Sequence, residues 1–339
     1  MRAVIYERTG GTEVLSVVHR PQPRPGPGEV LVEVAVSGVN PTDWKARRGP
    51  GELTIPQVPH HDGAGTVKAV GPGVERPMRG DRVWLWDVAF DRPSGTAQEL
   101  VVVPAAHAVP MADAVSFDVG ASLGIPALTA HRCLTAGLDT PEQLSESALK
   151  GRNVLVAGGA GAVGHAAIQL ASWAGAAVIS TVSSPRKAQL AAAAGAHRVI
   201  DYSQVDVATA VRSVAPLGVD LIVEVNPSSN LALDIAVVAP NGTIAIYASD
   251  GPDLVPFPIR AAMLKNVRTQ FVLTYTTTTS QKTAAVQSVA RAADAGVLEV
   301  GEDAGLPLTR FPLNQTGAAH DLVQSGFTGK VLIDVPPLT

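Results

Sequence analysis

The sequence predicts an α/β protein of two domains, one rich in β-strands and one doubly wound around a parallel sheet. Three observations predict this fold class. The chain has 339 residues, which suggests about two domains of ordinary size. Up to about residue 109, short β-branched runs lie between proline and glycine clusters. Further along, apolar runs of strand length alternate with segments of helical spacing.

The composition excludes several classes of protein. Hydrophobic residues make up 46% of the chain and charged residues 17%, so a sizeable core is available. The formal net charge of −4 indicates neither a nucleic-acid-binding surface nor a polybasic membrane anchor. The sequence has no signal-peptide pattern and no apolar run of membrane-spanning length. Its one cysteine, Cys133, excludes an internal disulfide framework, so we expect a reduced, cytoplasmic setting.

The N-terminal part is expected to be all-β. Residues 30–36 are a typical strand, and the proline and glycine clusters at 21–28 and 71–73 supply turns. Residues 80–82 turn the chain into another apolar run, 83–86. Strands at this spacing predict a small barrel or sandwich.

The middle of the chain is expected to form the doubly wound domain. Helical spacing runs from residue 116 to 136, and a polar loop follows at 139–149. The expected strands are 153–157, 177–182, 198–200, 219–223 and 243–246, and the expected helices are 162–174, 185–194, 205–214 and 231–238. The strands are continuous apolar runs, which is typical of a parallel sheet covered on both faces.

The C-terminal part is mixed. Residues 267–273 suit a last strand of the parallel sheet, 282–295 and 318–324 read as helices, and 330–335 as a final strand. This return is too short to fold alone, so we expect it to complete the first domain. The predicted domains are therefore 1–125 together with 273–339, and 126–272.

The most informative motif is a glycine-rich turn after the strand at 153–157. Gly159, Gly161 and Gly164 form G-x-G-x-x-G at the head of a helix, where the backbone can approach a pyrophosphate. The helix N-terminus favours negative phosphates. Such a turn can also serve packing alone, but the strand and helix around it favour a dinucleotide site. Its predicted members are Gly158, Gly159, Ala160, Gly161, Ala162, Val163 and Gly164.

The end of the next strand indicates which dinucleotide binds. NAD sites usually carry an acidic residue there, whereas this chain has Ser183, Ser184, Arg186 and Lys187. Hydroxyls and cations suit a 2′-phosphate, which predicts NADP(H) as the cofactor. Ser184 before Pro185 also suits a helix cap, and the two roles are compatible.

With these motifs, the chain resembles the zinc-independent quinone oxidoreductases (zeta-crystallin-like) of the medium-chain dehydrogenase/reductase superfamily, near the enone-reductase branch. The resemblance spans nearly the whole chain. The motifs that carry it, besides the glycine-rich turn, are residues 38–45, 62–67, 80–83, 126–130 and 329–331. It implies a GroES-like β-barrel catalytic domain plus a Rossmann doubly wound parallel-sheet domain, with the active cleft between them.

The resemblance implies further roles. Ser183, Lys187 and Tyr202 would surround the 2′-phosphate, and Asn40 would lie near the nicotinamide. Further cofactor contacts would be Thr129, Asn226, Ala248, Ser249 and Lys330. It also implies a homodimer joined through the sheet edge at residues 267–273.

No metal is expected. Alcohol dehydrogenases of the same superfamily bind catalytic zinc through a cysteine, a His-Glu pair and a further ligand. Here the matching positions hold Asn40, the pair His61-Asp62, and Gly124. One histidine and one aspartate cannot make a three-ligand site. His61 is instead a candidate substrate contact, or a hydrogen-bonded structural histidine.

Without a Lewis acid, we expect reduction of a quinone or an α,β-unsaturated carbonyl, in which hydride reaches the β-carbon and charge develops on the carbonyl oxygen. A donor at that oxygen stabilises the charge. Lys45 is the candidate donor, with Asn40 as the second catalytic residue, although Lys45 also suits a solvated basic surface run. Trp44 and Trp86 would form apolar substrate walls or belong to the core.

Two alternative functions stay open. An enoyl-thioester reductase would use the same chemistry on a substrate carried by a phosphopantetheine arm. A non-catalytic NADPH-binding protein would hold the cofactor without turnover. Neither alternative involves a nucleic acid or a membrane.

Overall fold

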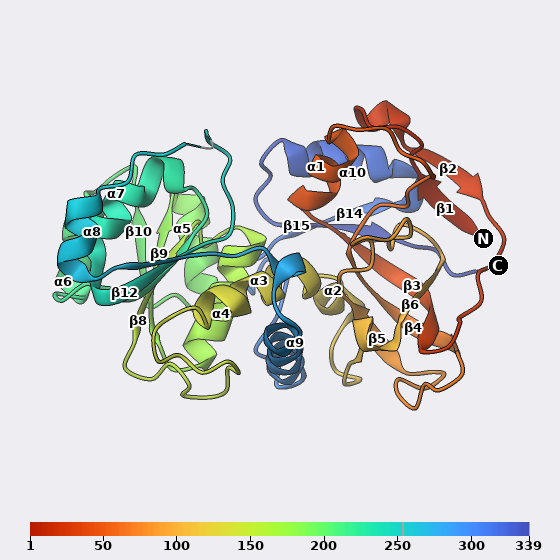
Figure 1. Ribbon diagram of the computed structural model, residues 1–339, viewed down its shortest axis with the longest axis horizontal. Helices are drawn as coiled ribbons and strands as arrows, with labels where there is room; N and C mark the ends of the chain where they lie inside the picture. Colours follow the sequence, from red (N-terminus) through yellow and green to blue (C-terminus); the bar gives the residue numbers. More distant parts are fainter. Residues whose placement is uncertain (253, 339) are drawn as a thin grey trace. The chain divides into compact units, whose positions relative to one another are not determined.

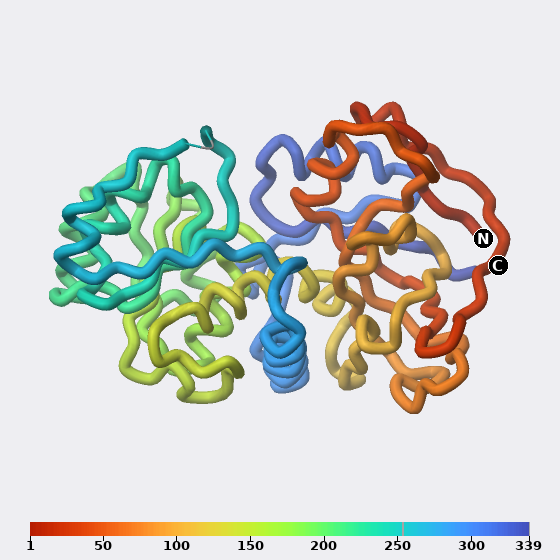
Figure 2. Tube along the Cα trace, viewed as in Figure 1, coloured from red at the N-terminus to blue at the C-terminus, as the bar shows by residue number. Residues whose placement is uncertain are grey.

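The computed structural model describes residues 1–252 and 254–338. The chain divides into two compact units, one of Met1–Ile125 with Leu308–Thr339 and one of Pro126–Pro307. In Figure 2 the C-terminal segment, in blue, returns to lie among the red and orange N-terminal strands of the first unit. No helix within the described ranges has the length and hydropathy that a transmembrane span requires.

The first unit is built on a seven-stranded, mostly antiparallel sheet with the order β14-β15-β3-β4-β5-β7, in which β6 also pairs with β3. Its strands are β3 (Glu29–Val39), β4 (Asp62–Val70), β5 (Arg82–Leu85), β6 (Leu100–Pro104), β7 (Ala108–Pro110), β14 (Leu308–Pro312) and β15 (Lys330–Asp334), beside the pair β1 (Arg2–Ile5) and β2 (Ser16–His19). Alternate residues of β3 (Val30, Val32 and Val34) are fully buried in its core.

α1 (Pro41–Arg48) is a helix in the segment before residue 109, where only strands were predicted. The first unit also contains α2 (Phe117–Gly120) and α10 (Thr316–Gln324), which lie in segments where helices were predicted. α1 has Asn40 as its N-cap, proline at its first position, and Asp43 accepting the Asn40 backbone N–H at 2.7 Å. This local capping pattern starts a helix inside a β-rich segment, which corrects the all-β prediction.

The helix predicted over 116–136 is two helices, α2 and α3 (Gly124–Leu134). A β-carbon on Gly120 would lie 2.8 Å from Ala64 Cβ, and one on Gly124 would lie 2.1 Å from Asp62 Oδ1. The two glycines thus let this segment approach β4 closely, and glycine is a weak helix former. The chain therefore bends between them instead of continuing as one helix.

The second unit contains a six-stranded parallel sheet with the order β10-β9-β8-β11-β12-β13. The strands are β8 (Asn153–Ala157), β9 (Ala177–Val182), β10 (Arg198–Asp201), β11 (Val219–Glu224), β12 (Val238–Ile246) and β13 (Arg268–Phe271). Helices α4 (Ala162–Trp173), α5 (Pro185–Ala193), α6 (Val207–Val214), α7 (Pro227–Val237) and α8 (Ile259–Lys265) flank it (Figure 1). The strand order reverses between β8 and β11, which is the point where such sheets bind dinucleotides.

The boundary of the second unit differs from the predicted one. Helix α9 (Thr279–Asp294) belongs to the second unit, because Ser288 Oγ accepts the Leu144 N–H at 3.0 Å and Arg291 donates to the Leu144 carbonyl at 3.1 Å. His165 also bonds the Ala304 carbonyl at 2.8 Å. The chain therefore re-enters the first unit at Leu308, whereas the sequence predicted residue 273.

Candidate active site

The glycine-rich turn joins β8 to α4 at the point where the strand order reverses. Gly158 has a φ of +68°, and a β-carbon on Gly159 would lie 2.0 Å from Ser180 Oγ of β9. A β-carbon on Gly164 would lie 2.4 Å from the Gly158 carbonyl oxygen, so α4 packs tightly on the turn. Gly161 differs, because its β-carbon would meet only that carbonyl, at 3.4 Å. The turn thus leaves the N-terminus of α4 approachable, which suits a pyrophosphate.

The predicted 2′-phosphate residues gather at the end of β9. Lys187 Nζ donates to Ser183 Oγ at 2.9 Å, and Ser184 Oγ caps α5 by accepting the Lys187 N–H at 3.3 Å. The Tyr202 N–H donates to the Val182 carbonyl at 3.0 Å, and the Tyr202 side chain is exposed. The structure therefore brings Ser183, Lys187 and the start of the Tyr202 turn together, with a cation and a hydroxyl already paired.

The other predicted cofactor residues of the second unit differ in their surroundings. Arg186 forms an exposed ion pair with Glu302, so its charge is partly compensated. Thr129 lies on α3 and is buried. Asn226, which follows β11, accepts a hydrogen bond from Ser228 Oγ at 2.6 Å. Ala160, Ala162 and Val163 complete the glycine-rich turn and the start of α4.

An apolar cavity of about 560 Å³ opens beyond the carboxyl ends of β12 and β13. Its lining includes Tyr247, Ala248, Ser249, Phe257, Phe271 and Leu273. The predicted cofactor residues Ala248 and Ser249 thus border it. A cavity of this size and character, at the carboxyl edge of a parallel sheet, is typical of a small-molecule site.

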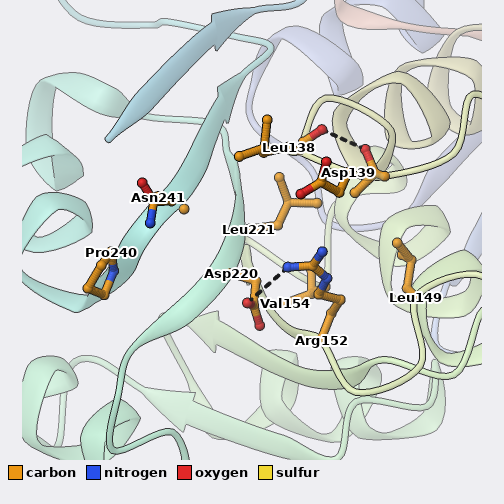
Figure 3. A pocket seen from close by; sticks show the side chains of 12 residues that line it. Leu138, Asp139, Leu149, Arg152, Val154, Asp220, Leu221, Pro240 and Asn241 are labelled. Carbon is orange, nitrogen blue, oxygen red and sulfur yellow. Dashed lines mark hydrogen bonds and ion pairs between the residues drawn. The ribbon is translucent and has the colours of Figure 1, made fainter. Parts of the chain in front are cut away.

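A second cavity, of about 280 Å³, lies at the amino ends of the strands of the same sheet (Figure 3). Arg152 and Asp220, which pair at 3.4 Å, line it together with Val154 and Leu221 at the starts of β8 and β11. Ligands of open parallel sheets bind at the carboxyl ends of the strands. This amino-edge cavity is therefore not the dinucleotide site.

In the first unit, four side chains form a buried polar network. The Asn40 amide donates to Asp62 Oδ2 at 2.7 Å, while its oxygen accepts from Lys330 Nζ at 2.7 Å. Lys330 also donates to the Val39 carbonyl at 3.2 Å, and its Nζ lies 3.8 Å from Asp62 Oδ2. Burial raises the pKa of Asp43 to about 8 and that of Asp62 to about 6, and it lowers the pKa of Lys330. Asp62 and Lys330 form the ion pair of this network, in which the lysine charge favours the ionised carboxylate.

This network includes two residues that the resemblance assigns to the cofactor. Asn40 and Lys330 were expected to contact the cofactor, but the polar ends of both side chains are used within the first unit. Both side chains are also almost fully buried. Their geometry suits positioning of α1 and of the segment that carries Asp62.

The positions that would hold catalytic zinc do not fit a zinc site. Asp62 Oδ1 accepts the Ile125 N–H at 2.9 Å, and Asp62 Oδ2 is taken by Asn40. The β-carbon of any side chain at position 124 would lie 2.1 Å from Asp62 Oδ1, so no third ligand fits there. Three protein ligands are the usual minimum for catalytic zinc.

The two neighbouring histidines are buried. His60, with a φ of 82°, bonds Ser37 Oγ at 2.8 Å and His320 Nε2 at 2.9 Å, and Arg47 Nε donates to His320 Nδ1 at 3.4 Å. Burial lowers the pKa of His60, and it lowers that of His320 to about 3, so both rings are neutral. His61 is also buried, which favours a structural role for it over open contact with a substrate.

The predicted catalytic donor lies on α1. Lys45 is exposed, and its Nζ lies 5.6 Å from the centre of the Trp44 ring. Trp44 itself is half-buried. Trp86 is buried, stacks on His107 with ring centres 4.0 Å apart, and donates to the Ala106 carbonyl at 3.2 Å. Trp44 and Lys45 are thus the more accessible of the predicted catalytic and substrate residues.

Two family models match the chain. One, described as an alcohol dehydrogenase GroES-like domain, covers residues 26–113, and the other, described as a zinc-binding dehydrogenase, covers residues 162–291. The first lies in the β-rich unit and the second in the parallel-sheet unit.

Individual relatives match nearly the whole chain. The quinone oxidoreductase of Sus scrofa is 31% identical over 340 residues, which cover 98% of this chain and 97% of that protein. A solved NAD-dependent alcohol dehydrogenase has a TM-score of 0.86 at 28% identity and covers 99% of this chain and 100% of its own. A mycobacterial protein solved with NADPH has a TM-score of 0.79 at 29% identity, covering 98% and 99%. The chain therefore belongs to the medium-chain dehydrogenase/reductase superfamily, as a quinone oxidoreductase-like, NAD(P)-dependent oxidoreductase.

Proposed function

We propose that the protein uses NADPH to reduce quinones or α,β-unsaturated carbonyl compounds by hydride transfer without zinc. The observation that carries this proposal is the state of Asp62. Its two carboxylate oxygens are bonded to Asn40 and Ile125, and the close approach of Gly124 leaves no room for a further ligand. A reductase without a Lewis acid needs an acceptor whose own conjugation takes up the charge.

The second unit fits NADPH. The turn from Gly158 to Gly164 and the N-terminus of α4 would hold the pyrophosphate. Lys187 and Ser183 would bind the 2′-phosphate, because no acidic side chain follows β9 to bind a free ribose hydroxyl. When bound, the reduced nicotinamide supplies a hydride.

Lys45 would serve the acceptor. An ammonium beside the carbonyl oxygen stabilises negative charge more strongly than a neutral donor does, since charge-assisted hydrogen bonds are the stronger kind. Trp44, next to Lys45, supplies an apolar surface that suits an aromatic or alkyl acceptor. Asn40 and Lys330 would act as positioning residues that fix the start of α1.

The test is a substrate panel followed by NADPH oxidation. The panel holds phenanthrenequinone, an alkyl enone and crotonyl-CoA, each assayed before and after dialysis against EDTA. We expect turnover of the quinone or the enone, unchanged by EDTA. Turnover of crotonyl-CoA alone would favour the enoyl-thioester reductase, and NADPH binding without any turnover would favour a binding protein. Activity lost with EDTA and restored by zinc would contradict the proposal.

A further inference from the structure

A chain of hydrogen bonds runs through the interior of the first unit, from helix α1 to the start of β4. At one end, Arg47 Nε donates to His320 Nδ1 at 3.4 Å. His320 Nε2 lies 2.9 Å from His60 Nε2, whereas the centres of the two rings are 5.1 Å apart, so the rings meet edge to edge. His60 Nδ1 in turn lies 2.8 Å from Ser37 Oγ. All four side chains are buried, so their polar atoms depend on one another for hydrogen bonds.

The other end of the chain shows which atom of each bond is the donor. Thr96 Oγ1 donates to the Asp62 carbonyl at 2.5 Å, and Ser37 Oγ lies 2.6 Å from Thr96 Oγ1. A hydroxyl group has one hydrogen to donate. Because Thr96 gives its hydrogen to the carbonyl, Ser37 must donate to Thr96. Ser37 then has no hydrogen left for His60, so His60 donates to Ser37 from Nδ1.

The same direction follows from the arginine end. A guanidinium only donates, so His320 Nδ1 is unprotonated and His320 carries its hydrogen on Nε2. His60 Nε2 accepts that hydrogen, which again leaves the hydrogen of His60 on Nδ1. A second proton on either ring would place two N–H groups face to face. Burial lowers the pKa of both rings, which agrees with two neutral histidines.

The chain holds the C-terminal end of α1. Arg47 is the seventh of the eight residues of this helix and is fully buried. Its Nη1 donates to the Gly10 carbonyl at 2.6 Å, and the Gly10 N–H donates to the Arg47 carbonyl at 3.0 Å. The N-terminal end of α1 is held separately, through the bond from Asn40 to the Asp62 side chain. Both ends of α1 are thus connected to the start of β4.

This chain suits positioning and not proton transfer. An arginine keeps its proton and a backbone carbonyl only accepts a hydrogen bond, so the chain has no acid at one end and no base at the other. We propose that His320 is a positioning residue that, through Arg47, sets the orientation of α1 and so the place of Lys45. This inference rests on the proposed function, because Lys45 has its role as donor to the acceptor only there.

The first test separates catalysis from cofactor binding. His320→Ala leaves Arg47 Nε buried without its acceptor. We expect kcat with phenanthrenequinone to fall about tenfold, because small displacements of a catalytic group have effects of this order. The Kd for NADPH should stay within about twofold, since the residues assigned to its phosphates lie in the other unit. His320→Gln should restore kcat, because its carboxamide can accept from Arg47 and donate to His60.

Thr316→Ala is the matched control. It removes a buried hydrogen bond, to the Leu313 carbonyl at 2.8 Å, from the same helix α10 but takes no part in the chain. Its kcat should stay within about twofold of wild type, and equal losses in Thr316→Ala and His320→Ala would overturn the positioning role. His60→Asn decides if His320→Ala does not fold. Asparagine tolerates the φ of 82° and keeps a donor for Ser37, but it is too short to accept from His320, so kcat should fall here too.

A second test does not depend on activity. In protein labelled with nitrogen-15 at histidine, long-range proton–nitrogen correlation spectra show which ring nitrogens carry hydrogen. We expect hydrogen on Nδ1 alone in His60 and on Nε2 alone in His320, with the signals assigned by their loss in His60→Asn and His320→Gln. The opposite tautomer, or a charged ring, would overturn the chain itself. A wild type that shows these tautomers but reduces no acceptor would instead overturn the proposed function, and the role of His320 in placing Lys45 with it.

Discussion

At the scale of single residues, the proposed chemistry depends on Lys45. Its ammonium would act on charge that develops only as the acceptor is reduced. Lys45→Ala should therefore lower kcat by about 100-fold, the usual effect of removing one such donor. The Kd for NADPH should not change, because Ser183 and Lys187, which we assign to the phosphate, lie in the other unit. Steady-state kinetics with phenanthrenequinone and a separate binding titration measure the two quantities.

Arg48→Ala is the matched control for this prediction. Arg48 is exposed on the same helix α1 and carries the same charge. If both variants lose activity equally, the effect comes from the basic surface as a whole. A kcat unchanged in Lys45→Ala removes this residue from the mechanism.

We expect Lys187 to determine the preference for NADPH over NADH. Lys187→Ala should weaken NADPH by about tenfold or more, since a hydrogen bond between charged groups contributes about 1.5–3 kcal/mol. NADH, which lacks the 2′-phosphate, should bind as before. Arg186→Ala should have a smaller effect, because Glu302 already compensates the Arg186 charge. Equal losses for NADPH and NADH in Lys187→Ala would refute the phosphate assignment.

Sites made of residues close together in the sequence were easier to predict than contacts between residues far apart in the sequence. Ser183 follows β9 and Lys187 lies in the first turn of α5, so residues assigned together to the 2′-phosphate come within 2.9 Å of each other. Lys330 and Asn40 are far apart in the chain, and no local pattern shows that both turn inward to Asp62.

At the scale of elements, the glycine-rich turn must pack tightly against α4 and must also let the pyrophosphate approach. Single substitutions can separate these two requirements. In Gly164→Ala the new β-carbon would lie 2.4 Å from the Gly158 carbonyl, and we expect a loss of about 2 kcal/mol in the free energy of unfolding. In Gly161→Ala the contact is 3.4 Å and the φ is −84°, so stability should change by less than about 1 kcal/mol.

Gly161→Ala should instead weaken binding of the cofactor. Gly161→Ala places a methyl group where the pyrophosphate approaches the backbone, so NADPH should bind at least about tenfold more weakly to a normally folded protein. Urea unfolding and NADPH titration of both variants make the comparison. A Gly161→Ala protein that binds NADPH normally would show that the cofactor does not approach this residue.

The parallel sheet was predictable as a set of elements because each strand is a continuous apolar run followed by helical spacing. α1 was not, since only eight residues form it and its signal is the cap at Asn40 rather than periodicity. α9 was predicted as a helix, but its unit was not. The contacts of Ser288 and Arg291 with Leu144 that decide its place join residues more than a hundred positions apart.

At the scale of the whole molecule, buried histidines make stability depend on pH. Burial lowers the pKa of His165 to about 4, below the value of about 6.5 in an unfolded chain. The folded state therefore binds fewer protons between these values, and the contribution of His165 is lost as the pH falls through that window. His165→Gln keeps a donor for the Ala304 carbonyl but cannot titrate. From about pH 6.5 to about pH 5, wild type should lose about 2 kcal/mol relative to this variant.

Urea unfolding of both proteins at several pH values measures this difference. Asp43 and Asp234 have raised pKa values, so they favour the folded state as the pH falls and oppose the histidines. Their contributions are common to wild type and His165→Gln and cancel in the comparison. Parallel pH dependence of the two proteins would mean that His165 has the same pKa in the folded and unfolded states.

At the same scale, we propose that two copies of the chain form a homodimer through the edge of the parallel sheet. β13 pairs with β12 on one side, and its other side pairs with no strand in the described part of the chain. Phe271 is 74% exposed there, and the nearby Ile259, Met263, Leu264 and Leu273 are also exposed. Unpaired strand edges and exposed apolar patches are typical of surfaces that bind a second copy.

Phe271→Glu should therefore give a monomer by sedimentation velocity, because a buried carboxylate would face its own copy across the two-fold axis. Leu217→Glu changes an even more exposed apolar residue between α6 and β11, away from this edge, and should leave the dimer intact. A monomeric wild type, or a Phe271→Glu protein that remains dimeric, would contradict this assembly.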